Sequence, residues 1–342
     1  MWDRPGAGSA YHRTWLPVLT LLTTGLPTVT GSLAVERAEP VAMVVAVQGS
    51  PIIQRPGRQR IRATVMDLLS PNDRIITSST AGATLAFLND RHRERVKPGS
   101  RVTVAPSGCE PASDVERNQP RSTARNIDLR GLRELARSGR AAAVVARGDE
   151  SPPRDPELPD RPPAVTPMYG SALLTPRPEL SWPRVAGAVG YRIQLLRPSG
   201  SLAWNARTTT NKLRYPAQAK SLPAGGPYRW RVTPRMTGRP PRVTESRFSV
   251  LPENEAKELI SQKSSSSSED PDELLMLAAA YQARRVYHEA LRIYERLARV
   301  APEEPAFQAA LADYYERAGR VPEAMAALQR AHDLKRQADR AD

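Results

Sequence analysis

The sequence predicts a multidomain β plus α protein, in which two small β modules precede a helical segment. Three observations predict this class. Residues 41–106 and 176–251 each contain short runs of alternating apolar and polar side chains between Gly, Pro or Asn-Asp turns, as half-buried strands do. Residues 271–342 instead repeat with a period of 34 residues, which is typical of stacked helical hairpins. The 33 prolines in 342 residues favour several modules on linkers over one large core.

The first 34 residues have the order of a secretory signal peptide. A slightly basic stretch precedes the apolar residues 15–29, and Ser32-Leu33-Ala34 offers a small-x-small cleavage site. The apolar run is shorter than the roughly 20 residues that a membrane-spanning helix needs. We therefore expect export to the periplasm or cell envelope, by a cleaved signal or an uncleaved anchor, and no later membrane span.

Residues 41–109 are expected to form the first β module, an antiparallel sheet with one wet face. Ala83, Leu85 and Phe87 point one way along one run, and Val102 and Val104 repeat the pattern. The basic heptapeptide at 91–97 follows an Asn-Asp turn, so we expect a hairpin or edge strand without an apolar face. We favour the interpretation that these basic residues are the charged side chains of a sheet edge over the interpretation that they bind nucleic acid.

This region resembles the FecR-like domain. The resemblance is carried by Val47 and Gly49 and by the phrases "NDRIIT" (72–77), "ATLAFLND" (83–90) and "KPGSRVTV" (97–104). It implies a periplasmic β module of the kind named after a ferric-citrate sensor. In the sensors this module follows a cytoplasmic anti-sigma segment and a membrane helix, which are not found here. An envelope signal sensor is therefore kept only as an alternative function.

Residues 110–175 are expected to be a linker rich in proline and charge, with one short helix. Ile127, Leu129, Leu132 and Leu135 lie at near-helical spacing, and Gly139 could end that helix. The remainder, such as "DESPPRDPELPDRPPAVTP", is too polar and too rich in proline to pack, which predicts an extended spacer.

Residues 176–251 are expected to form a second β module, a small sandwich. Its predicted core residues fall on period-2 spacing: Trp182, Tyr191, Ile193, Leu195, Trp204, Tyr228, Trp230 and Val232. The phrases "LSWP", "GYRIQL" and "YRWRV" resemble the fibronectin type III-like domains of exported bacterial proteins. The module has fourteen basic and two acidic residues, a net charge of +12, which would attract an anionic envelope polymer.

The helical segment at 271–342 follows a serine-rich linker, residues 252–270. Offsetting the segment by 34 residues aligns several pairs: Leu277 with Leu311, Ala278 with Ala312, Tyr281 with Tyr315, Ala290 with Ala324 and Tyr294 with Leu328. This pattern resembles the tetratricopeptide repeat (TPR). We expect two repeats and a C-terminal capping helix, with the alanines allowing close approach and Tyr281, Tyr294 and Tyr315 filling the space between turns.

The TPR resemblance implies a groove on the first helix of each repeat that binds a protein or peptide. The residues at groove-facing positions are Asp272, Ala279, Gln282, Asp313, Glu316 and Arg317. Residues 270–342 hold thirteen acidic and eleven basic residues, so a mixed or basic peptide would fit. The competing interpretation is that these charges form a solvated face.

The sequence contains no pattern that predicts catalysis. Cys109 is the only cysteine, which excludes an internal disulfide, and the four histidines lack metal-ligand spacing. Phosphate-binding glycine loops and nucleophile motifs are also absent. We therefore expect no enzyme activity, cofactor or metal, and nucleic acid is an unlikely ligand.

The leading hypothesis is an envelope adaptor or scaffold that binds a protein through its TPR groove while its β modules contact the envelope. A peptidoglycan- or anionic polysaccharide-binding protein is the alternative.

Overall fold

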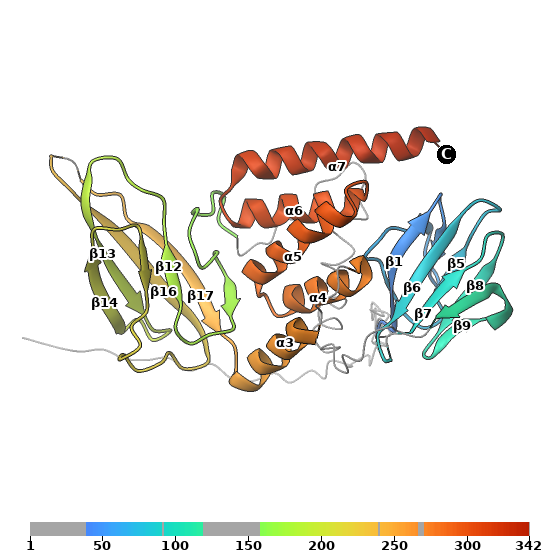
Figure 1. Ribbon diagram of the computed structural model, residues 1–342, viewed down its shortest axis with the longest axis horizontal. Helices are drawn as coiled ribbons and strands as arrows, with labels where there is room; N and C mark the ends of the chain where they lie inside the picture. The colour runs from blue at the N-terminus through green and yellow to red at the C-terminus, as the bar shows by residue number, and fades with distance from the viewer. Residues whose placement is uncertain (1–38, 91, 119–157, 239, 266–269, 342) are drawn as a thin grey trace, which may run out of the picture. The chain divides into compact units, whose positions relative to one another are not determined.

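The computed structural model describes residues 39–90, 92–118, 158–238, 240–265 and 270–341 (Figure 1). Several antiparallel sheets and a set of C-terminal helices confirm the mixed β plus α class. The predicted signal peptide and the predicted short helix near Ile127 lie outside the described residues. Among the residues that the structure does describe, no helix is both long and apolar enough to span a bilayer.

The first β module consists of two five-stranded sheets around one core. One sheet has the order β10-β7-β6-β1-β4 and the other β3-β2-β5-β8-β9. The strands are β1 (Ala42–Gln48), β2 (Ile52–Gln54), β3 (Arg60–Arg62), β4 (Leu68–Leu69), β5 (Arg74–Ile76), β6 (Gly82–Phe87), β7 (Arg93–Val96), β8 (Arg101–Ala105), β9 (Gly108–Glu110) and β10 (Val115–Asn118). The predicted inward residues Leu85, Phe87, Val102 and Val104 are buried in this core, which confirms the period-2 pattern.

The basic heptapeptide does not form an edge strand. Its strand β7 pairs with β6 on one side and with β10 on the other, so it lies inside the sheet. His92, Glu94 and Val96 are buried, while Arg95 is exposed. The expected hairpin is confirmed, since β7 pairs antiparallel with the preceding strand β6. The expected edge position and the expected lack of an apolar face were wrong, because β10 covers the other side of β7 and Glu94 faces inward together with Val96.

The second β module contains a five-stranded sheet, β11-β17-β16-β13-β14, and a small β12-β15 sheet. The strands are β11 (Ser171–Leu173), β12 (Glu179–Ser181), β13 (Ala188–Leu196), β14 (Leu202–Thr208), β15 (Lys212–Arg214), β16 (Gly225–Met236) and β17 (Thr244–Val250). Seven of the eight predicted core residues are buried, and Trp204 is half-buried against Tyr215. The module begins earlier than predicted, because β11 lies in the expected linker and pairs in parallel with β17.

Five helices follow within the described residues, labelled as in Figure 1: α3 (Glu253–Ser265), α4 (Pro271–Ala283), α5 (Tyr287–Val300), α6 (Pro305–Arg317) and α7 (Val321–Ala341). The helix α3 occupies most of the segment that was predicted to be a serine-rich linker. Ala256 and Leu259 are buried at a spacing of three residues, and their apolar contacts explain why the segment folds. The polar Gln262, three residues further on, is buried on the same side.

The four last helices obey the 34-residue period at their ends. Asp270 and Glu304, which are 34 residues apart, cap α4 and α6, and each is followed by a proline at the first helical position. Arg285 and Gly319 are also 34 residues apart, and both adopt a left-handed conformation, with φ of 59° and 68°. The period therefore holds for the starts of all four helices and for the ends of α4 and α6, whereas α7 extends beyond the position equivalent to the end of α5.

One of the predicted tyrosines is placed differently. Tyr281 and Tyr294 are buried as expected, but Tyr315 is only half-buried and donates a hydrogen bond to Glu295 at 3.1 Å. Its neighbour Tyr314 fills the space between hairpins instead, with its ring 5.3 Å from that of Tyr294.

The helices share a hydrophobic cluster with the first β module. Met43, Met66 and Leu88 belong to the same buried cluster as Leu274 and Tyr294. These β-module residues are not part of the module's own core, which is formed by residues on the other face of its strands. One sheet of the first β module therefore has apolar residues on both faces.

Candidate functional site

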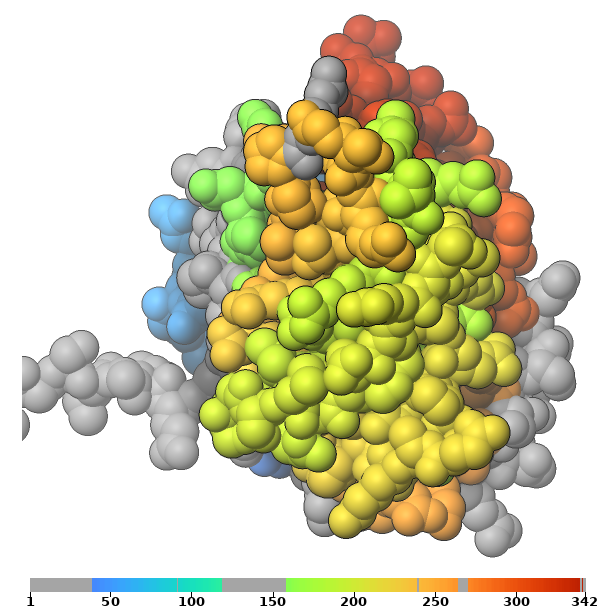
Figure 2. Space-filling model, turned by 90° about the vertical axis from the view of Figure 1, so that its left-hand side faces the viewer, coloured from blue at the N-terminus to red at the C-terminus, as the bar shows by residue number. Residues whose placement is uncertain are grey.

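The strongest concentration of charge lies on the outward face of the large sheet in the second β module. Side chains alternate along each strand, so the residues opposite the buried core share this face. Arginines from four strands belong to it, and we call five of them the arginine face: Arg192, Arg207, Arg229, Arg231 and Arg247. In Figure 2 residues of this module, coloured yellow-green to yellow, form the surface that faces the viewer.

Arginines stand directly opposite each other on neighbouring strands of this face. Arg192 is paired in register with Arg207, and Arg229 with Arg247. Directly opposed like charges destabilise a sheet, by up to about 1 kcal/mol for each pair. The two pairs lie four residues apart along the strands, since Arg192 is opposite Thr233 and Arg229 is opposite Leu196. Positive charge is therefore spread along the sheet.

The acidic residues of the module leave much of this charge uncompensated. Glu245 pairs with Arg231. Glu179 lies on the small sheet and pairs with Lys212 at 2.8 Å and Arg214 at 3.2 Å, which lowers its pKa. Within the described residues, Arg192, Arg207 and Arg229 have no acidic partner. All three side chains are exposed, so an anion from solution can reach them.

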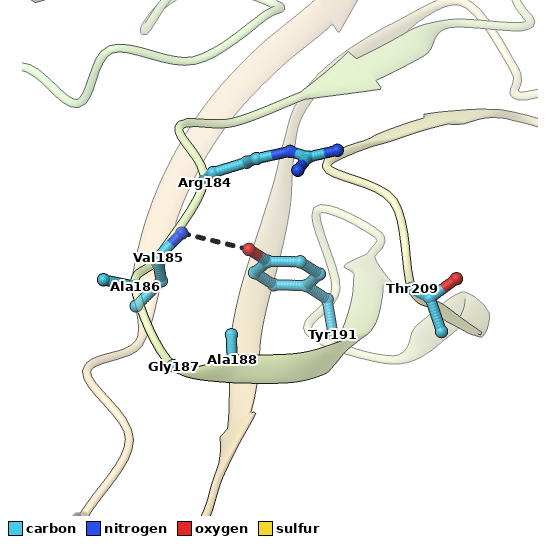
Figure 3. Close-up of a pocket in the computed structure, with 7 residues that line it drawn as sticks. All are labelled: Arg184, Val185, Ala186, Gly187, Ala188, Tyr191 and Thr209. Atoms are coloured by element: carbon cyan, nitrogen blue, oxygen red, sulfur yellow. Dashed lines mark hydrogen bonds between the residues drawn. The ribbon is translucent and has the colours of Figure 1, made fainter.

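A shallow cavity of about 400 Å³ opens at one end of the same module (Figure 3). It is lined by the turn 184–188 together with Tyr191 and Thr209. The hydroxyl of Tyr191 accepts a hydrogen bond from the backbone N–H of Val185 at 3.0 Å, so its role is to hold this turn. The side chain of Arg184 is the only charged group in the lining.

The predicted groove residues of the first hairpin contact other parts of the same chain. Asp272 lies 3.3 Å from Arg93 of β7, and burial raises its pKa to about 6 although Arg93 opposes that shift. Ala279 is 1% exposed and belongs to the shared hydrophobic cluster. Gln282 accepts a hydrogen bond from the hydroxyl of Tyr294 at 3.3 Å.

The predicted groove residues of the second hairpin lie on one face of α6. Asp313 and Arg317 form an ion pair at 3.0 Å, and the Arg317 guanidinium stacks over the ring of Tyr287 at 4.7 Å. Arg317 is 8% exposed, whereas Asp313 and Glu316 are half-buried. The six predicted residues thus do not form one open surface, and groove binding stays a prediction.

Sequence reasoning missed a buried polar cluster in the first β module. The Glu94 carboxylate, with no exposed surface, accepts bonds from Arg117 at 2.6 and 2.8 Å and from the backbone N–H of Cys109 at 2.6 Å. His92 lies 3.2 Å from Glu94 and stacks on Phe87 with ring centres 4.4 Å apart. The only available indication was the alternation His92-x-Glu94-x-Val96, which places all three on one face.

This cluster does not have the features of a metal or nucleophile site. Burial, followed by the neighbouring Glu94, raises the pKa of the Cys109 thiol far above its usual range, so the thiol stays protonated. In the part of the chain that the structure describes, no group of three or more His, Cys, Asp or Glu side chains could hold a metal ion.

Comparison of the chain with protein-family models and with curated proteins finds no match.

Proposed function

We propose that this protein is a non-enzymatic scaffold of the cell envelope whose arginine face binds a linear acidic polysaccharide. The observation that carries the proposal is a set of three exposed arginines without an acidic partner among the described residues, Arg192, Arg207 and Arg229, of which Arg192 and Arg207 are paired across neighbouring strands. The guanidinium is a planar fork of N–H donors that matches a carboxylate in two parallel hydrogen bonds. A row of carboxylates along a polymer would therefore replace the missing internal partners.

The dimensions of the face suit an extended chain rather than a compact ligand. Four adjacent strands span about 14 Å, since neighbouring strands lie about 4.8 Å apart. Arg229 and Arg231 are two residues apart on β16, which separates them by about 7 Å along the strand. A polymer with regularly spaced acidic groups can meet several of these arginines at once, and each weak contact then adds to the others.

The side chains of the face favour an acidic polysaccharide over nucleic acid. Single-stranded nucleic acids are held by aromatic side chains on which bases stack. On the outward face, the described positions between the arginines carry Gln194, Leu196 and Thr233. The ring of Tyr169 does reach this face, but the Arg247 guanidinium already lies over it at 4.7 Å. The aromatic residues of these strands mostly face the buried core. The predicted export through residues 1–34 would bring the protein to envelope polymers.

Titration of the full chain with polygalacturonate, a carboxylate polymer, tests the proposal, with neutral dextran as the reference polymer. We expect binding at low salt that weakens as salt rises, with a log–log slope of about −2 if the three arginines without an acidic partner displace counterions. The variant Arg192→Gln/Arg229→Gln should weaken binding by about tenfold or more, because two charge-assisted contacts are lost.

The matched control is Arg214→Gln/Arg242→Gln, which removes the same charge from exposed positions of the module outside the arginine face. It should keep affinity within about threefold of the parent chain. Equal weakening by both pairs would show that net charge alone attracts the polymer, and tighter binding of single-stranded DNA than of polygalacturonate would refute the assignment of ligand. Fractionation of cells with N-terminal sequencing of the mature chain tests the envelope location separately.

A further inference from the structure

The first β module carries a second basic surface, on the outward face of its sheet β3-β2-β5-β8-β9. Side chains alternate along each strand, so the residues opposite the buried core share this face. Four of them are exposed arginines from three strands: Arg60, Arg62, Arg74 and Arg101. Arg60, Arg74 and Arg101 have no acidic partner among the residues that the structure describes. An anionic partner from solution can therefore reach them.

An apolar pair lies between these arginines. One row across four strands has the order Arg-Ile-Ile-Arg, with each residue opposite the next: Arg62, Ile52, Ile76 and Arg101. The adjacent row is polar: Arg60, Gln54, Arg74 and Thr103. Both isoleucines are half-buried, and neither belongs to a hydrophobic cluster of the described chain. We call the four arginines and the two isoleucines the isoleucine–arginine face.

The helices pack on the other sheet of this module. The residues that join the module to the helical cluster lie on β1, β4 and β6 or in the segments next to them, for example Met43, Leu68 and Ala86. Among the described residues, β2, β3, β5 and β8 contribute no member to that cluster. The isoleucine–arginine face is therefore not the surface that the helices cover.

The apolar pair distinguishes this face from the arginine face of the second β module. A hydrophilic acidic polymer gains from the charges but not from two isoleucines between them. An anionic lipid bilayer has phosphate groups at its surface and acyl chains beneath, and binding to it increases with both charge attraction and buried apolar area. The combination of flanking arginines and a central apolar pair therefore matches a lipid surface better.

The spacing of the arginines also suits a lipid surface. Arg62 and Arg101 are separated by three strand spacings, about 14 Å, so they can contact different headgroups. An arginine keeps its guanidinium at the level of the phosphates while its apolar stem extends toward the acyl chains. The guanidinium fork donates two parallel hydrogen bonds to a phosphate. Ile52 and Ile76 then face the apolar layer between the bound headgroups.

We propose that the isoleucine–arginine face docks the first β module on an anionic phospholipid membrane. This docking is independent of the proposed polymer binding, because it uses the other β module. Few arginines and two half-buried isoleucines give a peripheral, reversible contact that salt weakens.

Co-sedimentation of the full chain with vesicles tests the proposal. One set of vesicles contains phosphatidylglycerol and phosphatidylcholine in equal parts, and the reference set contains phosphatidylcholine alone. We expect binding to the anionic set only. The variant Arg74→Gln/Arg101→Gln should weaken that binding by about tenfold or more, because each basic residue at the membrane surface contributes separately.

The matched control is Arg214→Gln/Arg242→Gln, which removes the same charge from exposed positions of the second β module. It should stay within about threefold of the parent chain. Arg74→Gln/Arg101→Gln should also keep its affinity for polygalacturonate, which separates membrane docking from polymer binding. Circular dichroism checks that each variant is folded.

The substitution Ile76→Thr tests the apolar contribution. It keeps a β-branched side chain in the strand but removes apolar surface, and should weaken vesicle binding by about threefold. This loss should persist as salt rises, whereas the loss in Arg74→Gln/Arg101→Gln should shrink because salt screens charge.

Fluorescent labelling identifies the docked face. An environment-sensitive fluorophore on Thr103→Cys should shift its emission to the blue with anionic vesicles. The same label on Glu116→Cys, which is exposed on β10 of the other sheet, should not shift. The native Cys109 is 2% exposed and stays unlabelled.

Three results would overturn the proposal. The first is a full chain that does not bind anionic vesicles. The second is equal weakening by the two arginine pairs, which would mean that net charge alone attracts the protein. The third is a blue shift at Glu116→Cys without one at Thr103→Cys, which would place a different face on the membrane.

Discussion

At the scale of single residues, Glu94 shows how a charge can be part of a core. Burial opposes ionisation of this carboxyl, but hydrogen bonds from Arg117, Cys109 and His92 outweigh it and hold its pKa below the usual range. A carboxylate with a depressed pKa stabilises the fold above the pKa of the unfolded chain, about 4.3, and this stabilisation is lost as pH falls through the folded-state pKa. The first β module should therefore weaken in acid below about pH 4.

The substitution Glu94→Gln should lower the free energy of unfolding at pH 7 by about 2 kcal/mol, because the charge-assisted bonds to Arg117 and Cys109 are lost. The gap between variant and parent should narrow as the pH is lowered, since the parent carboxylate is then protonated too. Urea denaturation at a series of pH values measures both effects.

Its control is Glu116→Gln on the adjacent strand β10, where the side chain is exposed and faces Arg95 across the sheet. This variant should change stability by no more than about 0.5 kcal/mol. A gap between Glu94→Gln and the parent that stays constant from neutral to acidic pH would contradict the assigned ionisation.

At the scale of elements, the turn inside each helical hairpin requires a left-handed residue. Arg285 supplies it in the first hairpin and Gly319 in the second. Such a conformation costs an ordinary side chain about 1 kcal/mol or more, and glycine adopts it freely. Gly319 has a second constraint, because a Cβ there would lie 2.7 Å from the carbonyl oxygen of Pro162 and 2.6 Å from the backbone nitrogen of Ala164.

The substitution Gly319→Ala should therefore destabilise the protein by about 3 kcal/mol, more than backbone strain alone can account for. Gly99→Ala provides the comparison, because Gly99 has a similar φ of 73° but a Cβ added there would meet no atom within 4 Å. It should cost only about 1 kcal/mol. Equal losses of stability in the two variants, measured by chemical denaturation, would show that the segment at 162–164 does not pack on this turn.

The elements that sequence could predict are those whose pattern is local. Strand alternation located the core residues of both β modules, and the 34-residue period located the segment that forms α4, α5, α6 and α7. The inside position of β7 depends on pairing with β10, which lies some twenty residues later, so composition alone suggested an edge. Helix α3 was missed because its apolar residues are few and its C-terminal end is rich in serine.

The candidate sites follow the same division. The net charge of +12 on the second β module could be counted from the sequence. The pairing of Arg192 with Arg207 could not be predicted, because it depends on the register of the two strands. The groove residues were predicted from the resemblance to the TPR. A resemblance gives the position of a residue within a repeat, but it does not show which other parts of the chain cover that residue. Ala279 is buried in a cluster that includes residues more than 200 positions away, such as Met43 and Met66.

At the scale of the whole molecule, charge and core are distributed differently. The second β module has a net charge of +12, whereas residues 270–342 have a net charge of −2. The proposed polymer binding is therefore assigned to the second β module, where the positive charge is concentrated, and not to residues 270–342. The hydrophobic cluster, in contrast, joins residues of the first β module to the helices, so the stability of these two parts should be coupled.

Met66→Ala tests that coupling. Met66 is 2% exposed, belongs to the shared cluster, and its sulfur lies 3.7 Å from the hydroxyl of Tyr294 on α5. Its truncation should cost about 2 to 3 kcal/mol and speed hydrogen exchange in α5 as well as in β1, because one core supports both. Ile53→Val alters the core of the first β module alone and should act mainly within that module. Unchanged exchange of α5 in Met66→Ala, with faster exchange in β1, would mean that the helices and the first β module are stabilised separately.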